Sequence, residues 1–271
     1  SRVDMPRLAM IFLVVSVALS VFGIWNAFHP RIKEISVRIP GLPAVWEDQR
    51  IVQLSDVHLG HIYRDGFLQG VVAQANEAEP AMVVITGDLF DGMDGRLENL
   101  VSPLSDLRSE HGTFFVTGNH ETYLGVEAVE KLLAEVSVTV LDDEVVDVAG
   151  LALVGLSYPE RGQKKDIASL LRSLSPDFSG RPNILLFHSP TSIDLFRSAG
   201  INLQLSGHTH LGQLFPFNFL THRIFKGYDY GLSEEASGYS IYTTNGVGTW
   251  GPAMRIGNIP EIVVITLHGD D

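Results

Sequence analysis

Short apolar runs rich in β-branched residues recur along this chain, and most of them stop abruptly at a polar or glycine-containing segment. Runs such as MVVIT at 82–86 and ILLF at 184–187 have no polar face, which is typical of strands buried on both sides. The pattern predicts strands at 35–39, 50–54, 82–86, 113–117, 151–156, 183–187, 203–205, 239–243 and 261–267.

Segments with helical spacing separate several of these strands. Apolar residues recur on one helix face within 67–75, 126–133 and 167–174. Strands that alternate with helices indicate an α/β fold in which helices pack over sheets. With 271 residues, 45% of them hydrophobic, and no low-complexity linker, the chain can bury one sizeable core.

The N-terminal segment is different in character. Residues 8–28 form a stretch of 21 residues without a charge, and a membrane-spanning helix needs roughly 20 apolar residues. Trp25 and Phe28 lie where interfacial aromatic side chains are common, and basic residues flank both ends about equally, so the charges assign no orientation. The stretch predicts a membrane anchor. A cleaved signal peptide, with Ala18 and Ser20 as small residues before the cut, and a buried core helix are the alternatives.

Charge and cysteine content exclude several classes of function. The formal net charge of -13 disfavours nucleic acid as a partner, because an acidic surface repels polyanions. A phosphate substrate stays compatible, since bound metal ions can invert the local potential. The chain has no cysteine, which excludes disulfides and thiolate metal sites.

Polar clusters follow five of the predicted strands, at the ends where sites are assembled in α/β folds. Their members are Asp56 and His58, Asp88 and Asp91, Asn119 and His120, His188, and His208 and His210. Residues two apart in extended backbone point to the same side, so each i, i+2 pair can reach one centre. Carboxylate, imidazole and amide groups suit Mn, Fe or Zn better than Ca, and we favour manganese. Any one of these residues alone is more often structural, but the set together predicts a metal site.

These motifs resemble the calcineurin-like metallophosphoesterase family. The matching blocks, in order, are the D-x-H of 56–58, the GDxxD of 87–91, the GNHE of 118–121, the lone His188 and the GHTH of 207–210. SGHTHLGQ and the distal GTWGPAMRIGNIPEI are similar to the bacterial membrane-associated YkuE-like and YaeI-like branch, although Leu211 replaces the first of a usual pair of glycines. The resemblance implies a four-layer α/β/β/α sandwich.

The resemblance also implies a role for each clustered residue. One divalent ion would be held by Asp56, His58, Asp88 and His210, and a second by Asn119, His188 and His208, with Asp88 bridging both. His120 would act as a general acid or charge-stabilising donor on the leaving oxygen, and Asp91 would orient it. A hydroxide on the metal pair would be the nucleophile.

The substrate is less defined. Protein serine/threonine phosphatases of this superfamily have an arginine where this chain has Gly92, which argues against that activity. We expect hydrolysis of a phosphodiester or pyrophosphate, with a lipid-linked phosphate compatible with the anchor. A broad phosphomonoesterase or nucleotidase is the alternative, and a non-catalytic metal-binding scaffold is an alternative of another class. Arg255 is the candidate for contacting a substrate phosphate, against a purely structural ion pair.

The predicted organisation is an anchor with its flanks over 1–33 and a catalytic domain over 34–271. The protein is expected at the bacterial cell membrane, with no obligate protein partner evident. Because no predicted ligand lies within residues 1–30, we expect their removal to leave activity on a soluble substrate intact.

Overall fold

A computed structural model describes residues 4–92, 97–160 and 162–270. Two six-stranded sheets form its centre. The first sheet has the order β1-β12-β2-β3-β4-β5, and the second has the order β10-β11-β9-β8-β7-β6. The strands of the first sheet are β1 (Arg31–Arg38), β2 (Arg50–Leu54), β3 (Met82–Ile85), β4 (Thr113–Phe115), β5 (Val138–Val140) and β12 (Glu261–His268). Those of the second are β6 (Glu144–Val148), β7 (Leu151–Leu156), β8 (Asn183–Phe187), β9 (Leu203–Ser206), β10 (Gly231–Glu234) and β11 (Ser240–Thr243).

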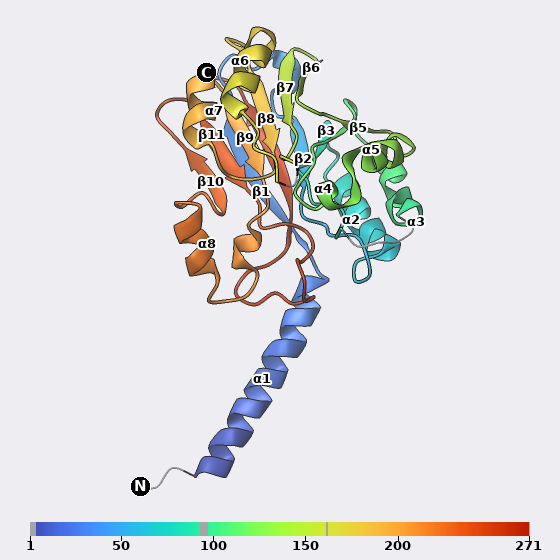
Figure 1. Cartoon of the computed structure of the whole chain (residues 1–271), viewed down its shortest axis with the longest axis vertical. Helices are drawn as coiled ribbons and strands as arrows, with labels where there is room; N and C mark the ends of the chain where they lie inside the picture. The colour runs from blue at the N-terminus through green and yellow to red at the C-terminus, as the bar shows by residue number, and fades with distance from the viewer. Residues whose placement is uncertain (1–3, 93–96, 161, 271) are drawn as a thin grey trace.

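Helices cover the outer face of each sheet (Figure 1). The first sheet carries α2 (Asp65–Glu77), α3 (Glu98–Val101), η2 (Ser102–Asp106), α4 (Glu121–Leu124) and α5 (Val126–Ala134), and the second carries α6 (Ile167–Phe178) and α7 (Ile193–Ala199). The remaining helices are α1 (Met5–Ala27), η1 (Ala44–Trp46), η3 (His210–Gly212) and α8 (Asn218–Ile224).

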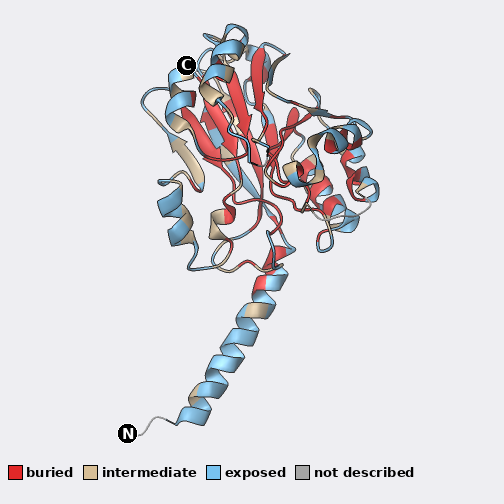
Figure 2. Cartoon of the chain, in the orientation of Figure 1, coloured by how far each residue is buried: buried red, intermediate tan, exposed pale blue. Residues whose placement is uncertain are grey.

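Alternation along the strands divides the core into three layers. Ile51 and Val84 point into the space between the two sheets, where they meet Leu186 and Leu205 of the second sheet. Val52, one residue on from Ile51, packs under the helices of the first sheet. A third cluster joins α6 and α7 to the outer face of the second sheet. The predicted four-layer α/β/β/α sandwich is confirmed, and Figure 2 shows the strands as its buried centre.

Parallel pairing brings the strand ends together. The neighbours β2, β3, β4 and β5 are parallel, and so are β7, β8, β9 and β11. All of the predicted site clusters follow strands of these two parallel groups. The carboxyl ends of such strands share one edge of their sheet, so each sheet delivers its clusters to one region.

The N-terminal helix α1 projects away from the domain (Figure 1). It is long and apolar enough to cross a membrane, with a mean hydropathy of 2.5 over a window of which 6% is buried. That low burial overturns the alternative of a core helix. Only Gly23, Asn26 and Ala27, in its last turns, are buried.

Candidate metal centre

The predicted ligands lie on the loops that leave five parallel strands. The loop after β2 carries Asp56 and His58, the loop after β3 carries Asp88, and the loop after β4 carries Asn119. The second sheet supplies the rest: His188 follows β8, and His208 and His210 follow β9. Side chains from both sheets meet here, as the strand-end pattern predicted.

Five of these residues have an unusual backbone conformation. Asp56, His58, Asp88, His208 and His210 have positive φ angles between 50° and 73°. Non-glycine residues rarely take this left-handed conformation, which costs of order 1 kcal/mol each and is found where a side chain must be aimed at a site. The turns are crowded as well: a Cβ atom on Gly118 would lie 2.2 Å from Asp88 Oδ1, so only glycine fits beside that carboxylate.

The first group of ligand atoms comes from Asp56, His58 and His210, whose nearest donor atoms all lie within 4.8 Å of one another. His210 Nε2 is 3.3 Å from Asp56 Oδ1 and 3.0 Å from His58 Nε2. Ligand atoms about 2.0–2.2 Å from an ion are separated by roughly these distances. Ser55 Oγ donates to Asp56 Oδ2 at 2.6 Å and fixes the other carboxylate oxygen.

The second group comes from Asp88, His188 and His208. His188 Nε2 lies 3.1 Å from both Asp88 Oδ2 and His208 Nδ1, while His188 Nδ1 donates to the Thr86 carbonyl at 2.7 Å. That bond fixes one proton on Nδ1. Burial opposes a charge on His188, but the neighbouring Asp88 carboxylate raises the pKa of its imidazole to about 10, so Nε2 must lose its proton before it can present a lone pair to an ion.

Among the described residues, two buried polar atoms at the centre have no hydrogen-bond partner: Asn119 Oδ1 and His58 Nδ1. A buried acceptor left unpaired costs about 1–3 kcal/mol, so an unpaired amide oxygen beside two acidic and several imidazole groups indicates a missing positive partner. The donor set therefore fits divalent ions.

The pKa shifts of two carboxylates and two histidines in the cluster also fit a site for divalent ions. The pKa of Asp56 is held well below its usual value, because His210 and its other histidine neighbours outweigh the opposing effect of burial. Burial also opposes ionisation of Asp88, but His188 lowers the pKa of that carboxyl to about 2. Burial lowers the pKa of His208 and of His210 to about 4. Two anionic carboxylates beside two neutral imidazoles make a site for cations.

His120 lies next to the cluster but is oriented differently from the prediction. Its Nδ1 donates to the backbone carbonyl of Asp91 at 3.0 Å, not to the Asp91 carboxylate. The carboxylate instead faces His58, with Asp91 Oδ1 3.6 Å from His58 Nδ1. The backbone N–H of His120 donates to Asp88 Oδ1 at 2.9 Å. Asp91 therefore holds the imidazole through its main chain, which the sequence alone does not reveal.

Glu121 is a residue whose role sequence reasoning missed. Its carboxylate is completely buried and accepts backbone N–H bonds from Asp88, Phe90 and Gly118 at 3.0, 3.2 and 2.7 Å. Burial and the nearby Asp88 raise the pKa of Glu121 to about 7. By collecting three N–H groups, this side chain fixes the turn that carries Asp88. The signal was present as the last letter of the GNHE block.

Arg255 requires a correction. We predicted that it contacts a substrate phosphate, but its side chain is fully buried. Its guanidinium donates to the carbonyls of Asn245, Gly246 and Gly248 and lies 3.3 Å from His210 Nδ1. No substrate can reach these donors. Arg255 therefore braces the loop around His210, and the described residues include no carboxylate in ion-pair contact with it, unlike the structural alternative.

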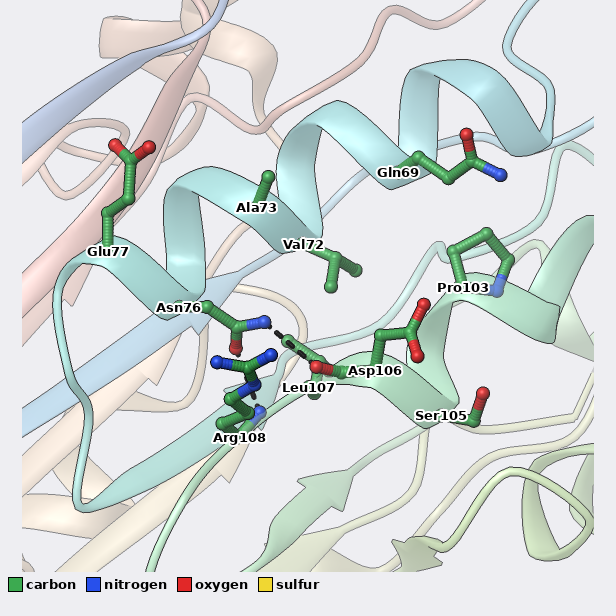
Figure 3. A pocket seen from close by; sticks show the side chains of 10 residues that line it. All are labelled: Gln69, Val72, Ala73, Asn76, Glu77, Pro103, Ser105, Asp106, Leu107 and Arg108. Carbon is green, nitrogen blue, oxygen red and sulfur yellow. Dashed lines mark hydrogen bonds between the residues drawn. The ribbon is translucent and has the colours of Figure 1, made fainter.

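A cavity of about 590 Å³ opens over the cluster. His58, Asp88, Asn119, His120, His208 and His210 line its floor, and Leu214, Phe217, Trp250 and Pro252 are among the residues of its walls. A cavity of about 700 Å³ lies elsewhere, between α2 and η2 (Figure 3). The described residues that line it include no histidine, and its Asn76 side chain is satisfied by the backbone of Asp106 and Arg108, so they offer no comparable chemistry.

A four-layer sandwich with acidic, imidazole and amide groups gathered at its strand ends has the site of a metal-binding α/β protein. The family model of the calcineurin-like phosphoesterases matches residues 49–212, and the chain belongs to that family. It is therefore a hydrolase of phosphoester bonds, and its cofactors are divalent metal ions.

Similar proteins agree with this family. The chain is 35% identical to an uncharacterised metallophosphoesterase of Campylobacter jejuni, over 97% of this chain and 71% of the relative. It is 34% identical to a Danio rerio transmembrane protein with a metallophosphoesterase domain, and the match covers 96% of this chain and 63% of that relative. The metallophosphoesterase YkuE of Bacillus subtilis is 30% identical to the chain, and the match covers 86% of this chain and 84% of YkuE. This agrees with the predicted YkuE-like branch of the family. A solved dimetal phosphatase from Danio rerio shares the fold, with a TM-score of 0.51, 14% identity and coverage of 76% and 90%.

Proposed function

We propose that the chain hydrolyses a phosphodiester or pyrophosphate with two divalent ions while α1 holds it at a membrane. The observation that carries this proposal is the set of three overlapping ligand groups at the strand ends. Two of them are joined through the third, which consists of His58, Asp88 and His120, and Asn119 Oδ1 beside them has no partner among the described residues. Seven side chains are more than one ion can use, and a carboxylate between the groups has an oxygen for each ion.

The ligands divide as follows. One ion would be held by Asp56, His58, Asp88 and His210, and the other by Asp88, Asn119, His188 and His208. When bound, the ions would polarise the phosphoryl oxygens and acidify water at the site. We favour manganese over iron and zinc, because no thiolate is present and two carboxylates and an amide accompany the histidines.

His120 is proposed as the group that serves the leaving oxygen. Its Nδ1 proton is committed to the Asp91 carbonyl, so Nε2 is the atom that can exchange a proton inside the pocket. In its protonated form Nε2 donates to the leaving oxygen, and after donation the neutral ring keeps its orientation. Asp91 is a positioning residue in this scheme.

The charge of the pocket favours a diester over a monoester. Among the described residues that line the pocket there is no lysine or arginine. A phosphomonoester carries two negative charges on one phosphorus, and these residues leave the second without a cationic side-chain partner. A phosphodiester carries one charge, and so does each phosphorus of a pyrophosphate that is esterified at both ends. This observation ranks the phosphomonoesterase or nucleotidase alternative second.

Membrane anchoring rests on α1 and on the relative that is named a transmembrane protein. Asn26 Nδ2 donates to the carbonyls of Arg255 and Asn258 at 3.2 and 2.8 Å, so the last turn of α1 is part of the folded domain. That contact favours a retained anchor over a cleaved signal peptide. We assign 1–33 to the anchor and its flanks and 34–271 to the catalytic domain, with β1 starting inside the flank at Arg31.

The test uses purified full-length protein in detergent, stripped of metal and titrated with Mn²⁺. We expect a plateau at two ions per chain, and faster turnover of bis-p-nitrophenyl phosphate and of a lipid pyrophosphate than of p-nitrophenyl phosphate. Asp88→Asn should lower all of these rates by more than about 10²-fold. Asp177→Asn, an exposed change on α6, is the matched control and should have no effect.

Three results would contradict the proposal. Binding that saturates at one ion excludes the binuclear site, and faster turnover of the monoester favours the alternative enzyme. A protein with two bound ions and no turnover of any phosphoester is the non-catalytic scaffold.

A further inference from the structure

A group of large apolar side chains is exposed on and beside α8. We call Phe215, Phe217, Phe219, Leu220, Ile224 and Trp250 the docking surface, and each is between 54% and 67% exposed. No residue of α8 is buried, and the helix lies at the end of the domain from which α1 projects (Figure 1, Figure 2). Exposed apolar patches of this kind mark contacts with proteins or membranes.

One short segment connects the docking surface to α1. The backbone N–H of Phe215 donates to the carbonyl of Ile256 at 2.7 Å, and the N–H of Arg255 donates to the carbonyl of Gly23 in α1 at 2.9 Å. Gly23 is so close to this segment that a Cβ atom there would lie 2.7 Å from Met254 Cγ. One short segment, 254–256, therefore contacts both α1 and the first residue of the docking surface.

Basic side chains lie on and just after α8, and also where β1 leaves α1. Arg223 and Lys226 are exposed on α8 and just after it, and Arg31 and Lys33 are exposed where β1 leaves α1. These cations contrast with the formal net charge of -13 of the whole chain. Apolar side chains flanked by cations are typical of segments that rest on bilayers with anionic lipids.

The docking surface also borders the pocket. Phe217 and Trp250 belong to both, and together with Leu214 and Pro252 they form an apolar wall above the metal ligands. Phe225, at the end of α8, stacks edge-on against His208 at 5.9 Å between ring centroids. The pocket thus has a polar floor for a phosphate and an apolar wall on the side of the docking surface.

We propose that the docking surface rests in the same bilayer that holds α1. The pocket then opens at the membrane interface and takes phosphoesters of lipids whose acyl or isoprenoid chains stay in the bilayer. This inference rests on the proposed anchoring and hydrolysis and adds the substrate class and its route of entry. A second copy of the chain or another protein would cover the surface without lipid contact, and the experiment separates these cases.

Tryptophan fluorescence measures the contact directly. The full-length chain with Trp25→Phe is placed in vesicles of phosphatidylcholine and phosphatidylglycerol with brominated acyl chains, which quench a tryptophan that touches them. The two tryptophans that remain are Trp46 and Trp250. Trp46 is buried and donates to the Val148 carbonyl, so lipid contact is reported by Trp250, which belongs to the docking surface. We expect quenching that disappears in a Trp25→Phe, Trp250→Phe variant. An unquenched Trp250 overturns the proposal.

A kinetic experiment tests whether contact of the docking surface with the bilayer aids the hydrolysis of lipid substrates. Phe219→Glu with Leu220→Glu changes two exposed residues that do not line the pocket. We expect an increase of about tenfold or more in the KM for a lipid pyrophosphate in the vesicles, because apolar contact with the bilayer is lost. Turnover of bis-p-nitrophenyl phosphate should stay unchanged. Val45→Glu, an exposed change in η1 after the far end of β1, is the matched control.

The failures are distinguishable. If the lipid KM is the same in the double variant and in the control, the docking surface does not deliver substrate and the inference is wrong. If the wild type fails to float with vesicles, the anchor is wrong, and if it turns over no phosphoester, the proposed hydrolysis is wrong. The quenching result depends on neither metal nor turnover.

Discussion

Five of the seven predicted ligands have an unfavourable left-handed backbone conformation. They are Asp56, His58, Asp88, His208 and His210. At about 1 kcal/mol each, such conformations persist only when surrounding contacts fix them. Here the fixing contacts are visible. Glu121 holds the turn of Asp88, and Asp56 accepts the backbone N–H of His208 at 3.1 Å. The ligands therefore form part of each other's scaffold.

The first residue-level prediction concerns His120. His120→Ala should bind both ions normally yet lower turnover by about 10²–10⁴-fold, because it removes one donor on the leaving oxygen. A nitrophenolate leaving group needs less protonation than an alkoxide. The turnover of nitrophenyl diesters should therefore fall less than the turnover of diesters with an alkoxide leaving group. Turnover is compared across leaving groups at saturating Mn²⁺, alongside metal stoichiometry.

Asp91→Asn is the matched control for His120. The carbonyl that holds the imidazole is unchanged by this substitution, so the leaving-group dependence of the rate should stay as in the wild type. A His120→Ala enzyme with wild-type rates on alkoxide leaving groups would remove the residue from the reaction, and loss of one ion would make it a ligand.

The second residue-level prediction concerns Glu121. Glu121→Gln leaves one oxygen to serve three N–H groups and directs an amide donor at them. We expect the free energy of unfolding to fall by about 1–3 kcal/mol, measured by urea denaturation. Glu127→Gln on α5, which is exposed, should change it by less than about 0.5 kcal/mol. Equal effects of the two changes would show that Glu121 does not fix the turn.

Sequence predicted the members of the cluster but not how each side chain is used. Asp88 and His188 could be found because each follows a strand of a parallel group, and the carboxyl ends of such strands share one edge of their own sheet. Arg255 was assigned to substrate because a sequence does not tell a guanidinium in solvent from one enclosed by three carbonyls. Asp91 contacts His120 through a carbonyl oxygen, which every residue type possesses, so the pattern could not reveal that contact.

At the scale of elements, the sequence missed the strands at three sheet edges. β5, β6 and β10 lie at edges, and they are short or carry charged and polar residues. Edge strands need no continuous apolar run, because one side faces solvent. The edge strand β1 was found, but it begins at Arg31 rather than at 35, with its charged residues exposed and its whole length paired with β12.

A prediction at this scale concerns the last turn of α1. Removing residues 1–30 eliminates the Asn26 bonds to the Arg255 segment, and Arg255 contacts His210. Contrary to the expectation from sequence, this truncation should weaken Mn²⁺ binding and lower turnover of bis-p-nitrophenyl phosphate, whereas removing residues 1–20 should not. Both proteins are compared in the same detergent by metal titration and turnover.

Asn26→Ala in the full-length chain should reproduce part of the effect, because it removes only the side-chain bonds. If the chain lacking residues 1–30 binds Mn²⁺ as the wild type does, the last turn of α1 is only a tether.

At the scale of the whole molecule, the ions would join the two sheets. Asp56, His58, Asp88 and Asn119 follow strands of the first sheet, and His188, His208 and His210 follow strands of the second. Gln53 already bridges them, donating to Thr86 and to the Ser206 carbonyl, both at 3.0 Å. Each ion would therefore bind ligands from both sheets, so metal binding and folding are coupled.

Chelation should accordingly destabilise the entire domain. Ligand at about 100 times its Kd stabilises a fold by about 2.7 kcal/mol, which for a domain of this size corresponds to a fall in Tm of roughly 5–10 °C when the metal is removed. Calorimetry with and without EDTA measures this. EDTA should lower the Tm of the Asp88→Asn variant much less than that of the wild type. It should lower the Tm of the Asp177→Asn variant as much as that of the wild type. A wild-type Tm indifferent to EDTA would mean that the sheets do not depend on the ions.

The left-handed ligands bear on how such a chain could change over generations. In a lineage freed from the need for metal, glycine or asparagine at these positions would relieve the backbone and stabilise the fold. Each replacement would also remove a ligand, and restoring that ligand would reinstate the unfavourable conformation. Loss of metal should therefore be easy to fix by selection for stability and hard to reverse.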